Sequence, residues 1–276
     1  ASGARNGIVG YADTHSIVSN VHSFLEVDAT KEKANDTGGV IGSLGAGASV
    51  DRCSFSGTLT VSGNSYDGFG GIVGWTNSGL ITNCANYGTL TCTGLAKCEL
   101  GGIVGGVSSK DFYVFSHNLN VGSVTNTAAN PLYTNALIGH LSRCRVENEI
   151  ANNHFLAGSA AQGIGGSGAR EEAISANNAQ LSGGEITYLL NEGRTDSIVW
   201  YQTLGEDNWP VLFAGHKTVY KSENGTYHNG EDAINMQAAD KTGKSSSATY
   251  TLKGQKVSQT TKNKDIYIVK GKKVLK

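Results

Sequence analysis

The stretch GFGGIVGWTNSGLITNC, Gly68–Cys84, raises the question on which the fold depends. Its glycines enclose the aliphatic pair Ile72-Val73, so it is either a loop that cradles a phosphate or one coil of a repeat. A P-loop ends in Gly-Lys-Ser/Thr. The chain has that ending at Gly243–Ser245, but Ala238 stands where the first glycine belongs and no strand-to-helix pattern surrounds it. Recurrence of the quoted pattern therefore decides the question.

The aliphatic pair between glycines returns at regular intervals along the chain. It is found at Gly7–Gly10, Gly39–Gly42, Gly71–Gly74, Gly102–Gly105 and, in a decayed form, Ala136–Gly139. The spacings are 32, 32, 31 and 34 residues, which is typical of a solenoid whose coils each pack against their neighbours. We therefore expect the glycines to turn corners with positive φ, where they carry no Cβ penalty.

Each repeat contains further short apolar segments. Ile81 follows the pair Ile72-Val73, and a third segment follows in turn, as in Gly57–Gly63 and Gly88–Gly94. We predict three short strands per coil, because a four-residue strand buries enough surface only when it is stacked on its copies. The predicted fold is all-β: a parallel β-helix, or β-solenoid, of about five 31–34-residue coils over residues 1–168.

The coil that begins at Gly70 resembles the GLUG motif of bacterial surface proteins. The matching positions are Gly70, Gly71, Gly74, Gly79, Ile81, Asn83, Cys84, Gly88 and Leu90. Among these, the residues that define the repeat are Gly71, Gly74, Ile81, Asn83 and Cys84. The coils at Gly102 and Ala136 depart from the pattern, because they lack the Asn-Cys element. The resemblance implies an adhesin-like or protease-associated protein that is secreted or held at the cell surface.

Residues 169–221 break the repeat and carry the chain's helix signal. Ser182 is a candidate N-cap with Glu185 three residues later, as in a capping box. Ile186, Leu189 and Leu190 then fall on one helical face, and Gly193 can end the helix. We expect a mixed α/β cap that lies over the unpaired backbone of the last coil. This block resembles the module that follows such repeats in surface proteins of Bacteroidota.

Three aromatic side chains in this block are candidates for stacking on a carbohydrate: Trp200, Tyr201 and Trp209. The competing expectation is that they are buried in the core of the cap, which is the usual place for large aromatic residues.

The chain ends in a polar segment and a second β pattern. Residues 222–248 are predicted to be a linker, and residues 249–276 a small β tail. We expect its strands at Thr249–Leu252, Asp265–Val269 and Lys273–Leu275, with a turn at 270–272. The ending IYIVKGKKVLK resembles C-terminal β-domains of secreted Bacteroidota proteins, some of which are sorting signals. The alternative is a lysine-edged β-module that blocks edge pairing.

Charge separates this tail from the body of the chain. Residues 241–276 contain ten lysines and the single acid Asp265, which leaves residues 1–240 with a formal charge of −10. Such a body lacks the basic face of a nucleic-acid-binding protein. The chain has no apolar run of 18 residues, and its first ten residues have no signal-peptide core. Because the first coil begins almost at Ala1, we expect further coils or another domain ahead of it.

The five cysteines are Cys53, Cys84, Cys92, Cys98 and Cys144. None is part of a Cys-x2-Cys pair, so we expect no zinc site. Cys53 and Cys84 occupy near-equivalent places in successive coils and could be stacked thiols or a disulfide, of which we favour the thiols. Cys92 and Cys98 flank a loop and are the better disulfide candidates in an exported protein.

No constellation in the chain predicts catalysis, a metal or a cofactor. The seven histidines form no His-Glu-x-x-His pattern, and Asp51, Asp111, Glu147 and Glu149 do not fall in one stacked column. The alternative is a carbohydrate-active β-helix, a polysaccharide lyase or glycoside hydrolase. Three or more carboxylates within about one sugar length on one face would favour it.

These observations predict a non-catalytic extracellular or cell-surface repeat protein. Its expected role is adhesion or structural display, through multivalent contact with a glycan or a protein. We expect a monomer that binds no nucleic acid and meets a membrane only through export or anchoring. A second alternative is a passive stalk for an N-terminal domain missing from this chain.

Overall fold

A computed structural model describes residues 5–30, 35–62, 67–94, 96–108, 113–142, 149–166, 173–194 and 196–230, together with the backbone of four strands after residue 248. The chain forms two compact units, residues 1–230 and residues 231–276.

Five sheets form the sides of the coils in the first unit. We name them A to E in the order in which a coil passes through them. Sheet A contains β5 (Thr37–Gly38), β10 (Gly68–Gly70), β15 (Glu99–Gly101) and β20 (Thr134–Asn135). Sheet B contains β1 (Val9–Ala12), β6 (Ile41–Leu44), β11 (Val73–Thr76), β16 (Val104–Val107) and β21 (Ile138–Leu141). Sheet C contains β2 (Ile17–Ser19), β7 (Ser49–Asp51), β12 (Gly79–Thr82), β17 (Tyr113–Ser116) and β22 (Glu149–Ala151).

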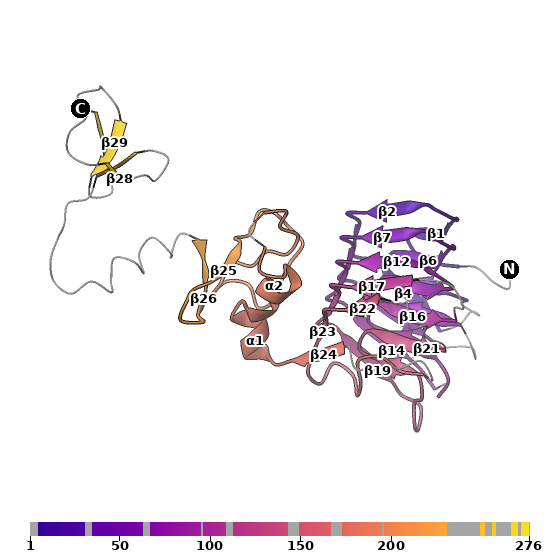
Figure 1. Cartoon of the computed structure of the whole chain (residues 1–276). Coiled ribbons are helices and arrows are strands. Elements are labelled where there is room, and N and C mark those ends of the chain that lie inside the picture. The colour runs from indigo at the N-terminus through magenta and orange to yellow at the C-terminus, as the bar shows by residue number, and fades with distance from the viewer. Residues whose placement is uncertain are drawn as a thin grey trace. The chain divides into compact units, whose positions relative to one another are not determined.

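The last two sheets complete each coil. Sheet D contains β3 (His22–Ser23), β8 (Ser54–Phe55), β13 (Ala85–Asn86), β18 (Leu119–Asn120), β23 (Asn153–Leu156) and β24 (Ala173–Ala176). Sheet E contains β4 (Glu26–Ala29), β9 (Thr58–Val61), β14 (Thr89–Cys92) and β19 (Ser123–Asn126). The strands stack in chain order, as the colour gradient of Figure 1 shows.

The predicted parallel β-solenoid is confirmed. Every pairing between the strands of these five sheets is parallel, and the chain makes about four turns. A full coil has five short strands, however, and the prediction of three was wrong. The missed strands belong to sheets A and D. They are mostly two or three residues long and rich in Gly, Ser and Asn, so they show no apolar alternation.

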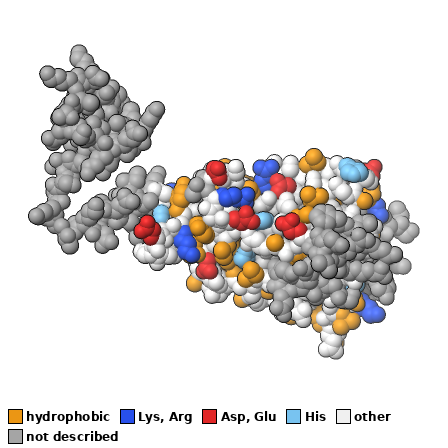
Figure 2. All heavy atoms as spheres, viewed as in Figure 1, with side chains coloured by type: hydrophobic (Ala, Val, Ile, Leu, Met, Phe, Trp, Pro, Cys, Tyr) orange, Lys and Arg blue, Asp and Glu red, His pale blue; other side chains and the backbone are white. Residues whose placement is uncertain are grey.

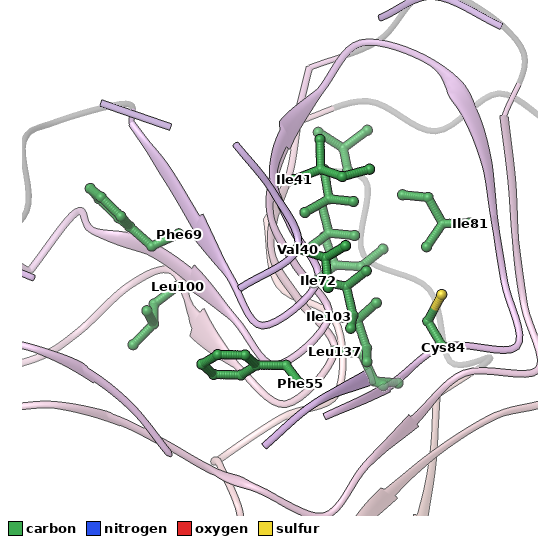
Figure 3. Packing of buried hydrophobic residues seen from close by; sticks show 14 of the residues in the cluster. Val40, Ile41, Phe55, Phe69, Ile72, Ile81, Cys84, Leu100, Ile103 and Leu137 are labelled. Atoms are coloured by element: carbon green, nitrogen blue, oxygen red, sulfur yellow. The ribbon is translucent and has the colours of Figure 1, made fainter. Parts of the chain in front are cut away.

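Aliphatic ladders fill the interior of the coils. Val40, Ile72, Ile103 and Leu137 follow one another at the corner between sheets A and B, and all four are fully buried (Figure 3). Ile81 continues a second ladder from Val50 to Phe115 in sheet C. Such stacking stabilises the coils because it removes apolar surface from water at roughly 25 cal/mol per Å².

The repeat glycines serve close packing rather than positive φ, which corrects our expectation. Neither Gly71 nor Gly74 is among the residues with positive φ. A Cβ atom added at Gly71 would collide with the carbonyl oxygen of Gly102 in the next coil. One added at Gly74 would lie 2.5 Å from the carbonyl oxygen of Gly42 in the preceding coil. These glycines therefore allow neighbouring coils to approach at the spacing of a β-ladder.

Positive φ is found instead at the corner between sheets C and D. Five residues at equivalent places have φ between 52° and 58°: Asn20, Arg52, Asn83, His117 and Asn152. Asparagine is one of the few non-glycine residues that adopts the left-handed region readily. The Asn83-Cys84 element is therefore a corner, after which the buried Cys84 points into the core.

Within residues 173–194, two short helices follow the solenoid, where one was predicted. They are α1 (Asn178–Ser182) and α2 (Glu185–Leu190). The predicted N-cap at Ser182 was wrong, because Ser182 is the last residue of α1 and the left-handed Gly184 precedes α2. The capping box is formed by Asn177 and Gln180 of α1.

The end of α2 agrees with the prediction. The N–H of Gly193 donates to the carbonyl oxygen of Tyr188 at 3.0 Å, and that of Glu192 donates to Leu189 at 2.8 Å. This pair of bonds is a Schellman motif, and it satisfies two of the carbonyl groups that a helix end leaves open. Leu189 itself is 38% exposed, so it does not share the buried face of Ile186 and Leu190.

A hairpin belongs to this block as well. It pairs β25 (Val219–Lys221) with β26 (Tyr227–Asn229) in antiparallel register. Residues 222–230 are therefore part of the first compact unit, and the predicted linker was wrong for them. Residues 231–248 lie outside the described residues.

The block 177–230, which we call the cap, packs along the outer side of sheet D. Leu181, Ile186, Leu190 and Trp200 form one buried cluster with side chains of that sheet. Contacts extend from the first coil, where Phe213 lies 4.4 Å from the ring of His22, to the last, where Asn152 Nδ2 donates to Leu189 O at 2.7 Å. We expected the cap over the end of the last coil. The contacts described here run along the side of the stack.

In the second unit, the described strands form a small antiparallel sheet. It contains β27 (Thr249–Thr251), β28 (Lys256–Val257), β29 (Ile266–Val269) and β30 (Lys272–Leu275), in the order β28-β27-β29-β30. The predicted strands are confirmed, and β28 was missed. Val269 pairs with Lys272, so Lys272 belongs to a strand and not to the predicted turn.

Candidate functional site

The aromatic residues predicted to stack on a carbohydrate lie in the cap. Trp200 is fully buried, so its prediction as a stacking residue was wrong: the hydrophobic cluster against sheet D encloses it. Tyr201 is half-buried, and its hydroxyl donates to Ile198 O at 3.1 Å. Trp209 is 37% exposed, and its ring stacks on Tyr87 at 6.5 Å. The three side chains do not form one surface platform.

Asp51 and the repeat residue Asn83 form a polar network across two coils. Asn83 Nδ2 and Thr82 Oγ1 both donate to Asp51 Oδ1 at 2.8 Å. Arg52 Nε donates to Asp51 Oδ2 at 2.7 Å. Through these hydrogen bonds, Asp51 joins two successive coils.

Cys53 and Cys84 are buried thiols in contact across successive coils, which confirms the stacked thiols that we favoured. Burial raises the pKa of Cys84 well above its ordinary value, and the hydrogen bond with Cys53 raises it further.

The disulfide predicted between Cys92 and Cys98 is not formed in this structure. The two side chains meet as buried thiols that share a hydrogen bond. That bond and burial raise the pKa of Cys98 well above its ordinary value, so the thiol stays protonated at neutral pH. Cys144 lies outside the described residues.

The strongest candidate site lies on the outer surface where sheets A and B meet. Parallel register aligns one position of sheet B through five coils: Tyr11, Ser43, Trp75, Gly106 and His140. The neighbouring column at the start of sheet A runs through four: Asp36, Gly68, Glu99 and Tyr133. We call these two columns the acid–aromatic face.

Glu99 and His140 form the centre of the acid–aromatic face. The Glu99 residue is only 5% exposed, and its Oε1 lies 2.5 Å from Nδ1 of His140. The ring of Tyr133 stacks on His140 at 4.1 Å. Burial raises the pKa of Glu99, although the hydrogen bond and charge of His140 act in the opposite direction. The charges of Asp36 and Asp67 raise it further.

Asp36 occupies the same face two coils earlier. Its carboxylate accepts hydrogen bonds from Ser43 Oγ at 2.7 Å and from the backbone N–H of Gly68 at 3.2 Å. Arg5 Nε lies 3.8 Å from the same carboxylate, and the Arg5 guanidinium lies 4.9 Å from the centre of the Tyr11 ring. Asp36 therefore joins the first three coils of the face.

Trp75 lies between these two acidic groups, and its half-buried ring depends on Gly106. A Cβ atom added at Gly106 would lie 3.0 Å from Trp75 Cδ1 and would collide with Glu99 Oε2. The missing side chain at Gly106 thus leaves space for the ring and the carboxyl group.

Our sequence reasoning missed this face. The signal was present: Asp36, Glu99 and Tyr133 each stand three residues before the first residue of the repeated pair motif. Alignment of the coils on that motif would have placed the three side chains in one column.

Neither a metal centre nor a membrane span emerges from the described part of the chain. Its His, Cys, Asp and Glu side chains include no group of three arranged to hold a metal ion. Its helices include none with the length and apolar character needed to cross a membrane.

Comparison with known proteins adds no relative to this description. No family model, curated protein or solved structure matches the chain. The functional interpretation therefore depends on the geometry of the acid–aromatic face.

Proposed function

We propose that this chain is a non-catalytic surface repeat protein that adheres by multivalent contact, and that the acid–aromatic face is its binding surface. One observation supports the proposal most directly. The register places Tyr11, Trp75 and His140 at the same outward position on every second coil. Two coil steps separate these rings by about 10 Å, so one extended ligand can contact several of them.

The chemistry of the face suits a glycan. Tyr11 is 48% exposed, and Trp75, Tyr133 and His140 are each half-buried. Rings in this state offer an apolar surface for a sugar, while carboxylates beside them accept hydrogen bonds from its hydroxyl groups. The side chains stand on a rigid parallel stack, which lowers the entropy lost on binding.

The hydrogen bonds that the two carboxyl groups of the face already make favour binding over catalysis. Asp36 accepts bonds from Ser43 and Gly68, and Glu99 is paired with His140. A glycosidase needs two carboxyl groups that both reach the scissile bond. Here each group is held by the scaffold before any ligand arrives.

A second candidate function, carbohydrate cleavage, has one specific observation in its favour. Asp36, Asp67 and Glu99 come from successive coils, and both aspartates act on the pKa of the buried Glu99. A buried carboxyl group with a raised pKa is a candidate general acid. Reducing-end and unsaturated-product assays on a polysaccharide panel, with wild type and Glu99→Gln, test this function. Turnover by wild type that disappears in the variant would replace the adhesion proposal.

Location and partners are part of the same proposal. We place the protein at the cell surface or outside the cell, because the Gly71–Cys84 pattern resembles GLUG repeats and the tail resembles sorting domains. Nucleic acid is not the proposed partner. On the face seen in Figure 2, the described Lys and Arg side chains are scattered among acidic and hydrophobic ones. A nucleic-acid site would gather them into a basic patch.

A glycan array combined with a panel of matrix proteins tests the proposal. We expect wild type to bind at least one extended glycan, and Trp75→Ala to weaken that binding by about tenfold or more, as for loss of a central aromatic contact. Trp209→Ala is the matched control, because it removes a partly exposed tryptophan from the cap. Equal binding by wild type and Trp75→Ala would refute the assignment of the face.

A further inference from the structure

Aromatic rings and acidic groups alternate along the acid–aromatic face. Tyr11 belongs to the first coil, Trp75 to the third and His140 to the fifth. Asp36 belongs to the second coil and Glu99 to the fourth. Since each coil step is about 4.8 Å, every ring position on the face lies one such step from an acidic position. A ligand that follows the face therefore meets a ring and an acid in turn.

The side chain of Arg5 shows which charge this alternation attracts. The parallel bridge between Asn6 and Thr37 places Arg5 one coil step before Asp36, in the same column. The Arg5 guanidinium lies 4.9 Å from the centre of the Tyr11 ring, and its Nε lies 3.8 Å from Asp36 Oδ2. A cation beside both a ring and a carboxylate gains cation–π and Coulomb energy together. One ring–acid pair of the face therefore already holds a cation.

Trp75 and Glu99 repeat this ring–acid pair two coils later. A Cβ atom added at Gly106 would lie 3.0 Å from Trp75 Cδ1 and would collide with Glu99 Oε2, so the ring and the carboxyl group lie side by side. In the column of Arg5, the third coil carries Gly68, which offers no cationic side chain. A cationic group of a ligand can therefore take the position at Trp75 that Arg5 takes in the first coil.

We propose that the acid–aromatic face selects glycans that carry positively charged amino groups, as polymers of unacetylated amino sugars do. This selectivity rests on the proposed glycan-binding function and adds the charge of the ligand to it. A sugar packed on Trp75 holds its ammonium group between Asp36 and Glu99, which stand one coil step to either side. His140 engages Oε1 of Glu99, and Oε2 is the oxygen beside the Trp75 ring. The charges of Asp36 and Asp67 both act on Glu99, so acids from three coils contribute to one field.

A basic peptide is the competing cationic ligand, and the spacing of the face disfavours it. Side chains on one face of an extended peptide repeat every ~6.8 Å, whereas Asp36 and Glu99 stand two coil steps, about 10 Å, apart. Lysine side chains at the peptide repeat fall out of register with these acids along the face. The alternation of rings with acids favours a ligand whose rigid rings and charges belong to the same unit, as in an amino sugar.

Two hexasaccharides that differ only in charge test the proposal on the full chain. The probes are a glucosamine hexamer and its fully N-acetylated form, titrated by calorimetry at pH 6, where carboxyl groups of ordinary pKa, about 4, are ionised. We expect wild type to bind the unacetylated hexamer at least about tenfold more tightly than the acetylated one, and added salt to reduce this preference.

Two isosteric variants locate the preference on the face. Asp36→Asn removes a charge but keeps a side-chain oxygen that can accept from Ser43 and Gly68. We expect it to reduce the preference by about fivefold or more, and Glu99→Gln to reduce it in the same direction. Glu223→Gln is the matched control, because it removes one exposed carboxylate from the hairpin of the cap, and it should keep the wild-type preference.

The outcomes separate the charge of the ligand from the proposed function. Equal affinity for the two hexamers, with both weakened in Trp75→Ala, would overturn the selectivity and leave glycan binding by the face in place. No binding of either hexamer would also overturn the selectivity, and binding that Trp75→Ala leaves unchanged would count against the face itself. An equal loss in Glu223→Gln and Asp36→Asn would assign the preference to overall charge. Oligolysine that binds more tightly than the glucosamine hexamer, and that Asp36→Asn releases, would replace the glycan by a basic peptide.

Discussion

The coil stack and the cap are stabilised in different ways. In the stack, each buried position is repeated: Val40, Ile72 and Ile103 make the same contact at successive levels. In the cap, polar contacts are used once. Asn191 Oδ1 accepts from the N–H groups of Val199 and Trp200 at 3.1 Å, and Gln202 Nε2 donates to Leu181 O at 2.8 Å. The stack should therefore unfold when the spacing between its coils is disturbed. The cap should unfold when one of its single buried contacts is lost.

Gly71→Val should break the stack and have the largest effect. The new side chain meets the carbonyl oxygen of Gly102, and backbone cannot move aside without separating two coils. We expect a loss of more than about 4 kcal/mol or no cooperative folding at all, measured by urea unfolding followed by circular dichroism. Gly215→Ala is the control, since a Cβ atom there meets nothing within 4 Å. Similar stability of the two variants would contradict the packing role of Gly71.

Trp200→Ala should break the cap and spare the stack. Removal of a fully buried tryptophan costs about 3–5 kcal/mol, and its cluster holds the cap against sheet D. We expect limited proteolysis to cut residues 177–230 while hydrogen exchange in β11–β14 stays slow. Loss of hydrogen-exchange protection throughout the stack and the cap would show that they unfold as one unit. That result would contradict the claim that the two regions are stabilised in different ways.

Acid should weaken the contact between the two regions through His154. Burial, together with the charge of His117, lowers the pKa of His154 to about 4, and among the described residues its buried Nδ1 has no hydrogen-bond partner. The neighbouring ion pair of His117 and Glu192 joins the corner between sheets C and D to the segment that follows α2. Since the unfolded chain binds this proton near pH 6.5, stability should fall as pH drops from about 6.5 to about 4, by up to about 3 kcal/mol.

Urea unfolding at pH 7 and pH 4.5 measures this loss. His154→Gln should reduce the pH dependence, and His15→Asn, at an exposed position, should keep it. An unchanged pH dependence in His154→Gln would assign the effect to other groups.

Reductant should have the smallest effect, on the thiols of sheet E and its neighbouring loop. Because Cys92 and Cys98 meet as thiols, we expect the unfolding midpoint to shift by less than about 1 °C when reductant is added. Alkylation of the unfolded, unreduced chain followed by mass spectrometry should label both residues. A peptide pair linked through Cys92 and Cys98 would restore the disulfide interpretation.

The fold was largely predictable because the same sequence pattern recurs in successive coils. Gly71, Ile81 and Cys84 have equivalents one coil away, so their common environment could be inferred from spacing alone. The two-residue strands of sheet D showed no such repeated pattern. The sequence therefore did not predict that sheet D has an apolar outer side, which the cap covers. Trp200 could not be assigned to core or surface, because burial of a single aromatic residue depends on contacts distant in sequence.

The most direct test compares Trp75→Ala with Trp209→Ala in titrations against the tightest glycan found, in a series of increasing chain lengths. We predict that wild-type affinity rises with glycan length until several coils are spanned, that Trp75→Ala removes this rise, and that Trp209→Ala retains it. The contrary result is an affinity that does not depend on glycan length, that is unchanged in Trp75→Ala and that is lost in Trp209→Ala. It would contradict the account and place binding on the cap.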